Sequence, residues 1–145
     1  MWYPAPMARA NDDDALAAEW HQLMSRYQRL MCALDRELGA HDLSASEFEV
    51  LQQLSDAEDC SLRMTSLAES AHLSQSALSR LVTRLERDGL LARKACEHDR
   101  RAQFVALTEA GRERYAEARP TQRRVLRENG TDCLDRDGVS SERSG

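Results

Sequence analysis

Apolar side chains recur every three or four residues in the first third of the chain, which is the spacing of one face of an α-helix. The stripe consists of Leu16, Trp20, Leu23, Tyr27, Leu30 or Met31, Leu34 and Leu38. It predicts a helix of about seven turns over residues 12–39, which Gly39 ends in a left-handed conformation. So long a helix offers more apolar surface than one small core needs, and we therefore expect it to pack on a second subunit.

Three more helices are predicted between residues 44 and 89. Ser44 and Glu47 have the spacing of a capping box and begin the second helix, whose buried face is Phe48, Leu51 and Leu54. Residues 56–60 are polar and predict a connection. A short third helix follows, with Met64, Leu67, Ala68 and Ala71 facing inward. After a break at residues 72–74, Ser74 caps a fourth helix that reaches about Asp88, with Gly89 just beyond it.

The apolar period then shortens, and residues 90–96 and 102–107 predict two short strands around the charged tip 97–101. Thr108 begins a fifth helix, which we expect Pro120 to interrupt or bend. Residues 1–11 and 131–145 lack the apolar pattern and are predicted to be disordered. The predicted fold is mainly α with a small β-hairpin wing. One domain covers 12–130, with a winged helix-turn-helix at about 44–107 and dimerisation helices at about 12–39 and 108–130.

Composition and charge narrow the class of protein. The 145 residues carry a net charge of −5, but residues 1–62 hold four arginines against twelve acidic residues, whereas residues 63–107 hold eight basic against five acidic ones. A basic segment beside an acidic one is typical of a DNA-reading module on a scaffold. No apolar run approaches the ~18 residues that a membrane span needs. We therefore expect a cytoplasmic protein that does not contact membranes.

The sequence offers no chemistry for catalysis or metal binding. It contains no G-x-S-x-G, H-E-x-x-H or glycine-rich phosphate loop, so we predict that the protein is not an enzyme and needs no cofactor. Its four cysteines, Cys32, Cys60, Cys96 and Cys133, stand singly, without the spacing of a zinc site. They are expected to be buried or stray thiols, with regulation through one reactive cysteine as the alternative.

Two sets of polar residues are candidates for DNA contact. On the fourth helix they are Ser74, Gln75, Ser76, Ser79, Arg80, Thr83 and Arg84, because the N-terminal residues of a recognition helix read base edges in the major groove. On the wing they are Arg93, Lys94, Asp99, Arg100 and Arg101. Arg93 and Lys94 are predicted to contact phosphates, and the tip arginines to enter the minor groove. Asp99 is expected to hold the tip by accepting from a nearby arginine such as Arg84.

The runs Leu62–Ala68, Leu73–Leu90, Asp99–Arg101 and Leu107–Arg112 resemble the MarR family of transcriptional regulators. The resemblance covers roughly residues 15–127. It implies a symmetric homodimer that binds double-stranded DNA at a palindromic operator, commonly as a repressor released by a small aromatic or phenolic effector. Asp99 and Arg101 match the family's wing-tip acid and arginine. The family usually closes with a long apolar helix, whereas residues 130–145 offer only Cys133, Leu134 and Val139.

Two interpretations remain open beside these expectations. Trp20, His21 and Met24 are candidates to line an effector cleft, although an amphipathic stripe more often forms core or dimer contacts. The winged helix is also compatible with a protein-interaction module. Salt dependence separates DNA binding from protein binding, because a protein that neutralises several phosphates loses affinity steeply as the salt concentration rises.

Overall fold

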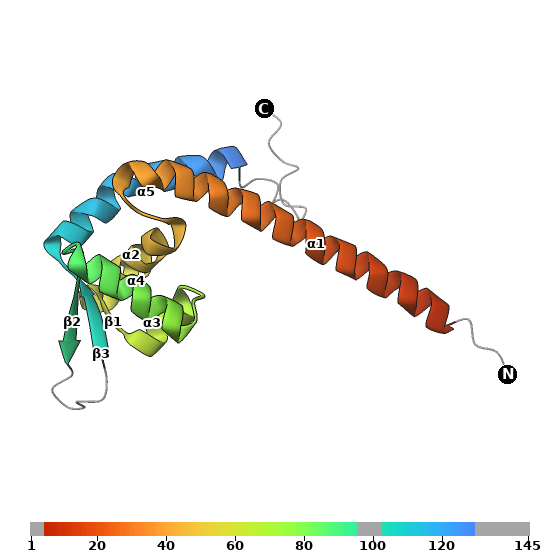
Figure 1. Cartoon of the computed structure of the whole chain (residues 1–145), viewed down its shortest axis with the longest axis horizontal. Coiled ribbons are helices and arrows are strands. Elements are labelled where there is room, and N and C mark those ends of the chain that lie inside the picture. The colour runs from red at the N-terminus through yellow and green to blue at the C-terminus, as the bar shows by residue number, and fades with distance from the viewer. Residues whose placement is uncertain (1–4, 96–102, 130–145) are drawn as a thin grey trace. The chain divides into compact units, whose positions relative to one another are not determined.

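The computed structural model describes residues 5–95 and 103–129, with side chains from residue 11 onward (Figure 1). The helices are α1 (Ala5–Leu38), α2 (Ala45–Asp56), α3 (Met64–Ser70), α4 (Gln75–Arg87) and α5 (Glu109–Asn129). The strands are β1 (Ser61–Arg63), β2 (Leu91–Ala95) and β3 (Gln103–Leu107), and the 3-10 turns are η1 (Gly39–His41) and η2 (Glu58–Cys60). The predicted class, mainly helical with a small β wing, is confirmed.

The chain divides into two compact units, which we describe separately. The larger unit comprises residues 34–124 and contains α2, α3, α4 and the sheet. The smaller unit comprises residues 1–33 and 125–145, of which the structure describes 5–33 and 125–129. Helices α1 and α5 each cross the boundary between the units.

The core of the larger unit is built from the apolar positions that the periodicity selected. Its large, fully buried side chains come mainly from α2, α3 and α4, and they are Leu38, Phe48, Val50, Leu51, Leu54, Leu67, Leu78, Val82, Leu85, Leu90 and Val105. The ring of Phe48 packs on that of Tyr115 with 5.3 Å between the ring centres, which joins α2 to α5. Burying each large apolar side chain stabilises the fold by roughly 1.5–3 kcal/mol, so this core holds α4 in place.

The helix-turn-helix is formed by α3 and α4. The Ser74 hydroxyl accepts a hydrogen bond from the backbone N–H of Ala77 at 3.2 Å, so Ser74 is the predicted N-cap of α4. In the turn, His72 adopts a left-handed conformation with φ of 57°. Gly89, with φ of 78°, follows α4 in the conformation that glycine favours. Both predicted ends of this helix are therefore confirmed.

The sheet has three antiparallel strands in the order β1-β3-β2, whereas a two-stranded hairpin was predicted. Leu62 of β1 and Arg93 of β2 both lie opposite Val105 of the central strand β3. Strand β1 was not predicted because it has only three residues, which are too few to show an alternating pattern. Asp59 and Cys60 just before it have positive φ and turn the chain into the strand.

The long helices differ from the prediction at three points. α1 begins at Ala5 instead of residue 12, because residues 5–10 include three alanines, which favour a helix without adding to the apolar stripe. It ends at Leu38, yet the left-handed residue is Asp42, three residues after Gly39. α5 continues through Pro120 to Asn129 without interruption. Buried Ala118 and Gln122 on either side of the proline account for this, because packing holds both flanking turns.

Candidate nucleic-acid interface

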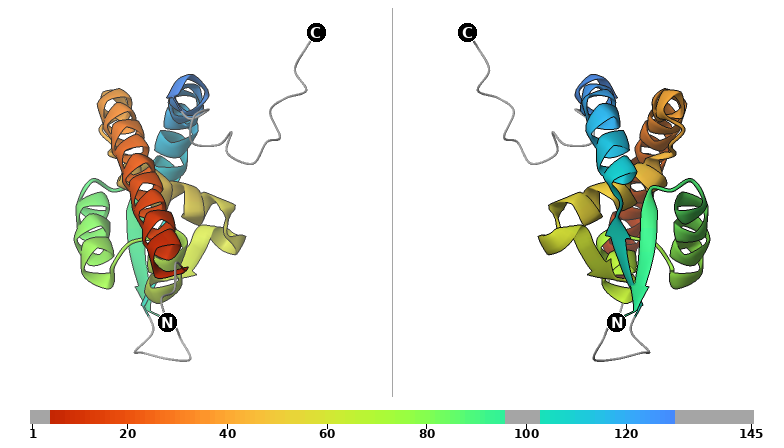
Figure 2. Two further views of the ribbon diagram at one scale, coloured as in Figure 1. Left: turned by 90° about the vertical axis from the view of Figure 1, so that its right-hand side faces the viewer. Right: turned by 90° about the vertical axis from the view of Figure 1, so that its left-hand side faces the viewer.

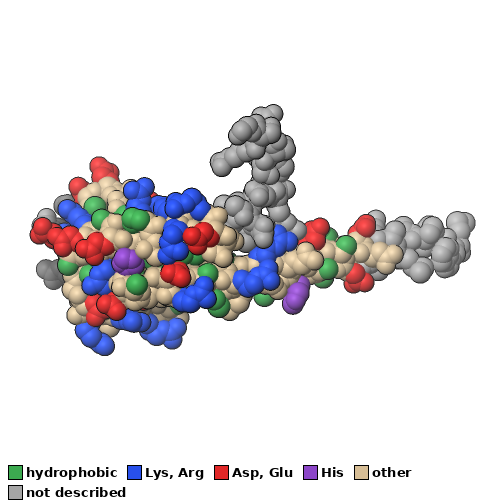
Figure 3. Space-filling view, turned by 90° about the horizontal axis from the view of Figure 1, so that it is seen from above, with side chains coloured by type: hydrophobic (Ala, Val, Ile, Leu, Met, Phe, Trp, Pro, Cys, Tyr) green, Lys and Arg blue, Asp and Glu red, His purple; other side chains and the backbone are tan. Residues whose placement is uncertain are grey.

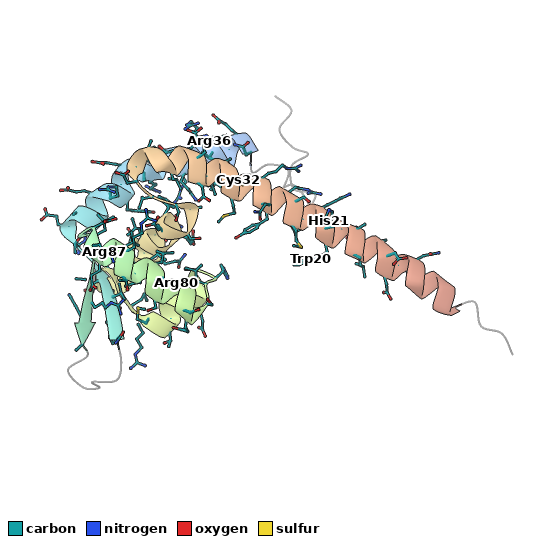
Figure 4. The ribbon with its side chains drawn as sticks, in the orientation of Figure 1. Trp20, His21, Cys32, Arg36, Arg80 and Arg87 are labelled. Atoms are coloured by element: carbon teal, nitrogen blue, oxygen red, sulfur yellow. The ribbon has the colours of Figure 1, made fainter. Side chains whose placement is uncertain are left out.

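One face of α4 is apolar and buried and the other is polar and exposed. Leu78, Val82 and Leu85 are fully buried. The predicted recognition residues Ser74, Gln75, Ser76, Ser79, Arg80, Thr83 and Arg84 are all exposed. Arg80 projects from the middle of the helix (Figure 4). The polar side chains near the N-terminus stand at the positive end of the helix dipole, where negative charge is favoured.

Arg84 is tied to the beginning of α2. Its Nε lies 3.6 Å from Oε2 of Glu47, a carboxylate that is only 2% exposed. The other oxygen of Glu47 accepts the backbone N–H of Ser44 at 2.9 Å, and the Ser44 hydroxyl accepts from the N–H of Glu47 at 3.1 Å, which completes the predicted capping box. Oε2 has no hydrogen bond, so the guanidinium of Arg84 is its charge partner. Asp99, the partner we predicted for Arg84, lies outside the described residues.

Thr83 is exposed, but its hydroxyl group is already engaged. It donates to the carbonyl of Ser79 at 2.8 Å and accepts from Nη2 of Arg93 at 2.8 Å. The hydroxyl proton is therefore used within the helix, and the side chain connects α4 to the wing. Direct reading of a base by Thr83 stays a prediction that this geometry does not favour.

The described part of the wing lies alongside the recognition helix (Figure 2). Arg93 is half-buried, and its guanidinium faces α4, where it contacts Thr83 and Glu86. Lys94, the next residue, is exposed, as expected for a phosphate contact. The tip residues 96–102, including the predicted contacts Asp99, Arg100 and Arg101, lie outside the described residues.

The junction between α4, β3 and α5 is fixed by Thr108. Its hydroxyl donates to the carbonyl of Gly89 at 2.6 Å and accepts the backbone N–H of Gly111 at 3.0 Å. Its own N–H donates to the carbonyl of Leu90 at 3.1 Å. Gly111 packs so closely that a β-carbon added there would lie 2.1 Å from the Leu90 oxygen. These contacts fix the chain that leaves the recognition helix against the first turn of α5.

The apolar stripe of α1 is exposed along the smaller unit. Leu16 and Trp20 are each 62% accessible, and Leu23, Met24 and Tyr27 are also exposed. Apolar side chains are visible at the surface along this helix, between charged ones (Figure 3). Trp20 and His21 extend from the same stretch (Figure 4), and His21 is exposed as well.

The effector candidates Trp20, His21 and Met24 are exposed on α1. In the larger unit, a recess of about 410 Å³ is lined by Asp42, Arg84, Asp88 and Arg114. Nη1 of Arg114 donates to the carbonyl of His41 at 2.9 Å, which holds that side chain at the edge of the recess. The effector site named from the sequence therefore remains a prediction.

In the described part of the chain, no group of three or more His, Cys, Asp or Glu side chains could hold a metal ion. None of the described helices is long and apolar enough to cross a membrane. Cys32 is exposed and Cys60 half-buried, and both are free thiols. Cys96 and Cys133 lie outside the described residues.

The polar, exposed face of α4 was predicted from the sequence, whereas the side-chain contacts that connect this helix to α2 and the wing were not. The capping box identified Glu47, yet nothing in the sequence indicated that its second oxygen meets Arg84. Thr83 and Glu86 are three residues apart and so share a helix face, which is the one signal that they meet the same partner. The phosphate contact predicted for Arg93 rested on its being a basic residue on a wing strand.

A helix-turn-helix with a polar, exposed second helix and a β-wing beside it defines the winged helix-turn-helix class of DNA-binding domains. The model of the MarR family matches residues 43–103, which contain α2, α3, α4 and the first wing strand β2. The chain belongs to the MarR family, as its solved relatives also indicate.

Two structures from Streptomyces coelicolor are similar to the chain over most of its length. AbsC, a MarR family transcriptional regulator, is 31% identical with a TM-score of 0.78, and the match covers 88% of this chain and 86% of AbsC. Sco3205, a MarR family transcriptional regulator in complex with DNA, is 30% identical with a TM-score of 0.77. That match covers 86% of this chain and 79% of Sco3205.

Among curated proteins, an uncharacterized HTH-type transcriptional regulator of Bacillus cereus is 35% identical over 81 residues. The match covers 56% of this chain and 52% of the relative, so the chain spans about half the length of the curated relatives it matches. The three relatives named here are all described as transcriptional regulators.

Proposed function

We propose that this protein is a sequence-specific, double-stranded-DNA-binding transcriptional regulator. The observation that carries the proposal is the polar, exposed face of α4, which is capped by Ser74 and lies beside the β2–β3 wing. Membership of the MarR family supports it, and so does the similarity to Sco3205, whose structure is a complex with DNA.

The recognition helix would enter the major groove with its N-terminal half. Gln75 has the amide geometry to pair with adenine, and Arg80 the guanidinium geometry to pair with guanine. The Ser79 hydroxyl can hydrogen-bond a base edge, and Ser76 is short enough to let the helix approach the bases closely. Lys94, Arg100 and Arg101 supply positive charge on the wing for phosphates or the minor groove.

The active unit is a homodimer on a palindromic operator. The exposed stripe of α1 supports this, because adjacent large apolar side chains on an accessible surface mark an interaction site. Two symmetry-related recognition helices then contact half-sites that are about 34–36 Å apart, one turn of the duplex. A single copy would read only one half-site.

Repression released by a small aromatic or phenolic molecule belongs to the same proposal and follows from the family resemblance. Trp20, His21 and Met24 remain the candidates for contact with that molecule. A Trp20→Phe variant that still binds DNA, but that no longer responds to compounds releasing the wild type, would support this assignment. An unchanged response would remove Trp20 from it.

The experiment that tests the function is fluorescence-anisotropy binding to DNA from the gene's own upstream region. Wild type, Arg80→Ala and Arg101→Ala are compared at two salt concentrations. We expect tight, salt-sensitive binding that both variants weaken, because each removes a guanidinium from the DNA-facing surface. Failure of folded wild type to bind any genomic DNA fragment would contradict the proposal and favour a winged helix that binds a protein.

A further inference from the structure

Arg93 is held by three side chains and has little freedom to reach outward. Its Nη2 donates to the Thr83 hydroxyl at 2.8 Å, its Nη1 to Oε1 of Gln103 at 3.5 Å, and its Nε lies 3.6 Å from Oε1 of Glu86. The second oxygen of Glu86 accepts the backbone N–H of Arg93 at 3.3 Å. The carboxylate of Glu86 therefore holds both the main chain and the side chain of one wing residue.

These contacts lie at the outer limit of the packing between the wing and α4. Leu91 is buried and Ala92 half-buried, whereas Lys94 and Ala95 beyond Arg93 are exposed. Among the described residues of β2, Arg93 is therefore the contact with α4 that lies nearest to the tip of the hairpin. These contacts are therefore well placed to influence the angle between the hairpin and α4.

The charge of Arg93 is balanced locally. A phosphate contact is favoured by a guanidinium whose charge and donors are free. Glu86 carries the opposite charge 3.6 Å from Nε of Arg93, and Nη1 and Nη2 already donate to Gln103 of β3 and Thr83 of α4. The planar fork of arginine suits such a bridge between three acceptors, and lysine cannot reproduce it. This geometry disagrees with the phosphate contact that the sequence predicted for Arg93.

We propose that Arg93 and Glu86 form a clamp that positions the wing relative to the recognition helix, and that Arg93 acts on DNA binding through this geometry without contacting DNA. The inference rests on the proposed DNA-binding function. A helix and a wing that enter neighbouring grooves must be held at a fixed angle, and an unclamped hairpin adds an ordering cost to binding. The clamp removes this cost because the free protein is already ordered.

The test compares operator affinity and its salt dependence for Glu86→Gln, Arg93→Lys and Arg93→Gln in the full chain. A clamp predicts that all three weaken specific binding, by about tenfold or ~1.4 kcal/mol, with the slope of log K against log salt unchanged. The direction in which Glu86→Gln changes DNA affinity decides between a clamp and a phosphate contact. Removing a negative charge near DNA should strengthen binding unless that charge is needed to hold Arg93. Asp88→Asn is the matched control, because it removes one acid from the end of the same helix and leaves the clamp intact.

A phosphate contact predicts the opposite pattern. Glu86→Gln would then bind as tightly as wild type or more tightly, Arg93→Lys would keep most of the affinity, and Arg93→Gln would lower the salt slope by about one. That pattern would overturn the clamp. Lys94→Gln changes the exposed neighbouring residue, which is predicted to contact phosphate. It therefore measures how much the salt slope falls when one such contact is lost. Circular dichroism and thermal melting verify that each variant is folded. If the wild type itself binds no DNA, that result counts against the proposed function and not against the clamp alone.

Discussion

Glu47 shows how much one carboxylate contributes at the scale of a single residue. One oxygen caps α2, and the other lies buried beside the guanidinium of Arg84 on the recognition helix. A buried charge is costly unless it is paired, so both contacts are needed to keep it in place. The Glu47 side chain therefore caps the start of α2 and holds α4 through Arg84.

The variants Glu47→Ala and Glu47→Gln separate the two roles of this side chain. Glu47→Ala removes the cap and the ion pair, and we expect it to lower the free energy of unfolding by at least ~1 kcal/mol. Glu47→Gln keeps a capping oxygen and loses only the charge, so its loss should be smaller. Urea denaturation measures both. Equal losses would mean that the ion pair with Arg84, and not the capping box, carries the stability.

Gly111 is required for space rather than for backbone freedom. A β-carbon there would lie 2.1 Å from the backbone oxygen of Leu90, which cannot rotate away as a side chain could. We expect Gly111→Ala to lower the melting temperature, although alanine favours a helix by about 1 kcal/mol over glycine. Gly39→Ala is the control, because the space around Gly39 is open. A melting temperature equal to or above that of wild type for Gly111→Ala would contradict this packing.

At the scale of elements, the side-chain contacts of α4 differ between its two halves. The N-terminal residues Gln75 and Ser79 are exposed, with side chains available to a ligand, whereas Thr83, Arg84 and Glu86 make contacts to the wing and α2. Substitutions in the first half should thus change which sequence is bound. Those in the second half should change how tightly any operator is bound.

Gln75→Ala and Ser79→Ala test this division. Each should relax preference at particular bases by roughly 1–3 kcal/mol, because a lost base contact affects only the base it pairs with. Affinities for a set of operators with single base changes measure the effect. A uniform loss over all of these operators would instead assign the residue to the phosphate backbone.

The sequence predicted an element more accurately where several local signals agreed than where the element depends on a distant partner. Both ends of α4 followed from Ser74 and Gly89, and the start of α2 from the capping box, since these signals lie within a few residues of each other. Strand β1 was missed because its partner β3 lies far along the chain, beyond the whole helix-turn-helix. The bonds of Arg93 were missed for a similar reason. A long side chain can reach several acceptors, and only the tertiary fold decides which of them are near.

At the scale of the whole molecule, the exposed stripe of α1 predicts the oligomeric state. Trp20→Glu places a charge in the proposed interface, and we expect it to shift the protein from dimer to monomer and to weaken operator binding. Gln22→Glu makes the same change of charge at an exposed polar position of the same helix and should leave the dimer intact. Light scattering after size-exclusion chromatography measures both masses. A monomeric wild type at micromolar concentration would refute the dimer.

The pairing of β1 with β3 has a consequence for the order in which the protein matures. Leu62 and Val105 are partners in the sheet, yet α3 and α4 both lie between them in the chain. During synthesis these helices leave the ribosome before the strand that closes the sheet beneath them, and such distant pairings form slowly. The nascent chain thus carries α4 without the closed sheet until β3 has left the ribosome, and a chain that terminates before β3 cannot form this sheet.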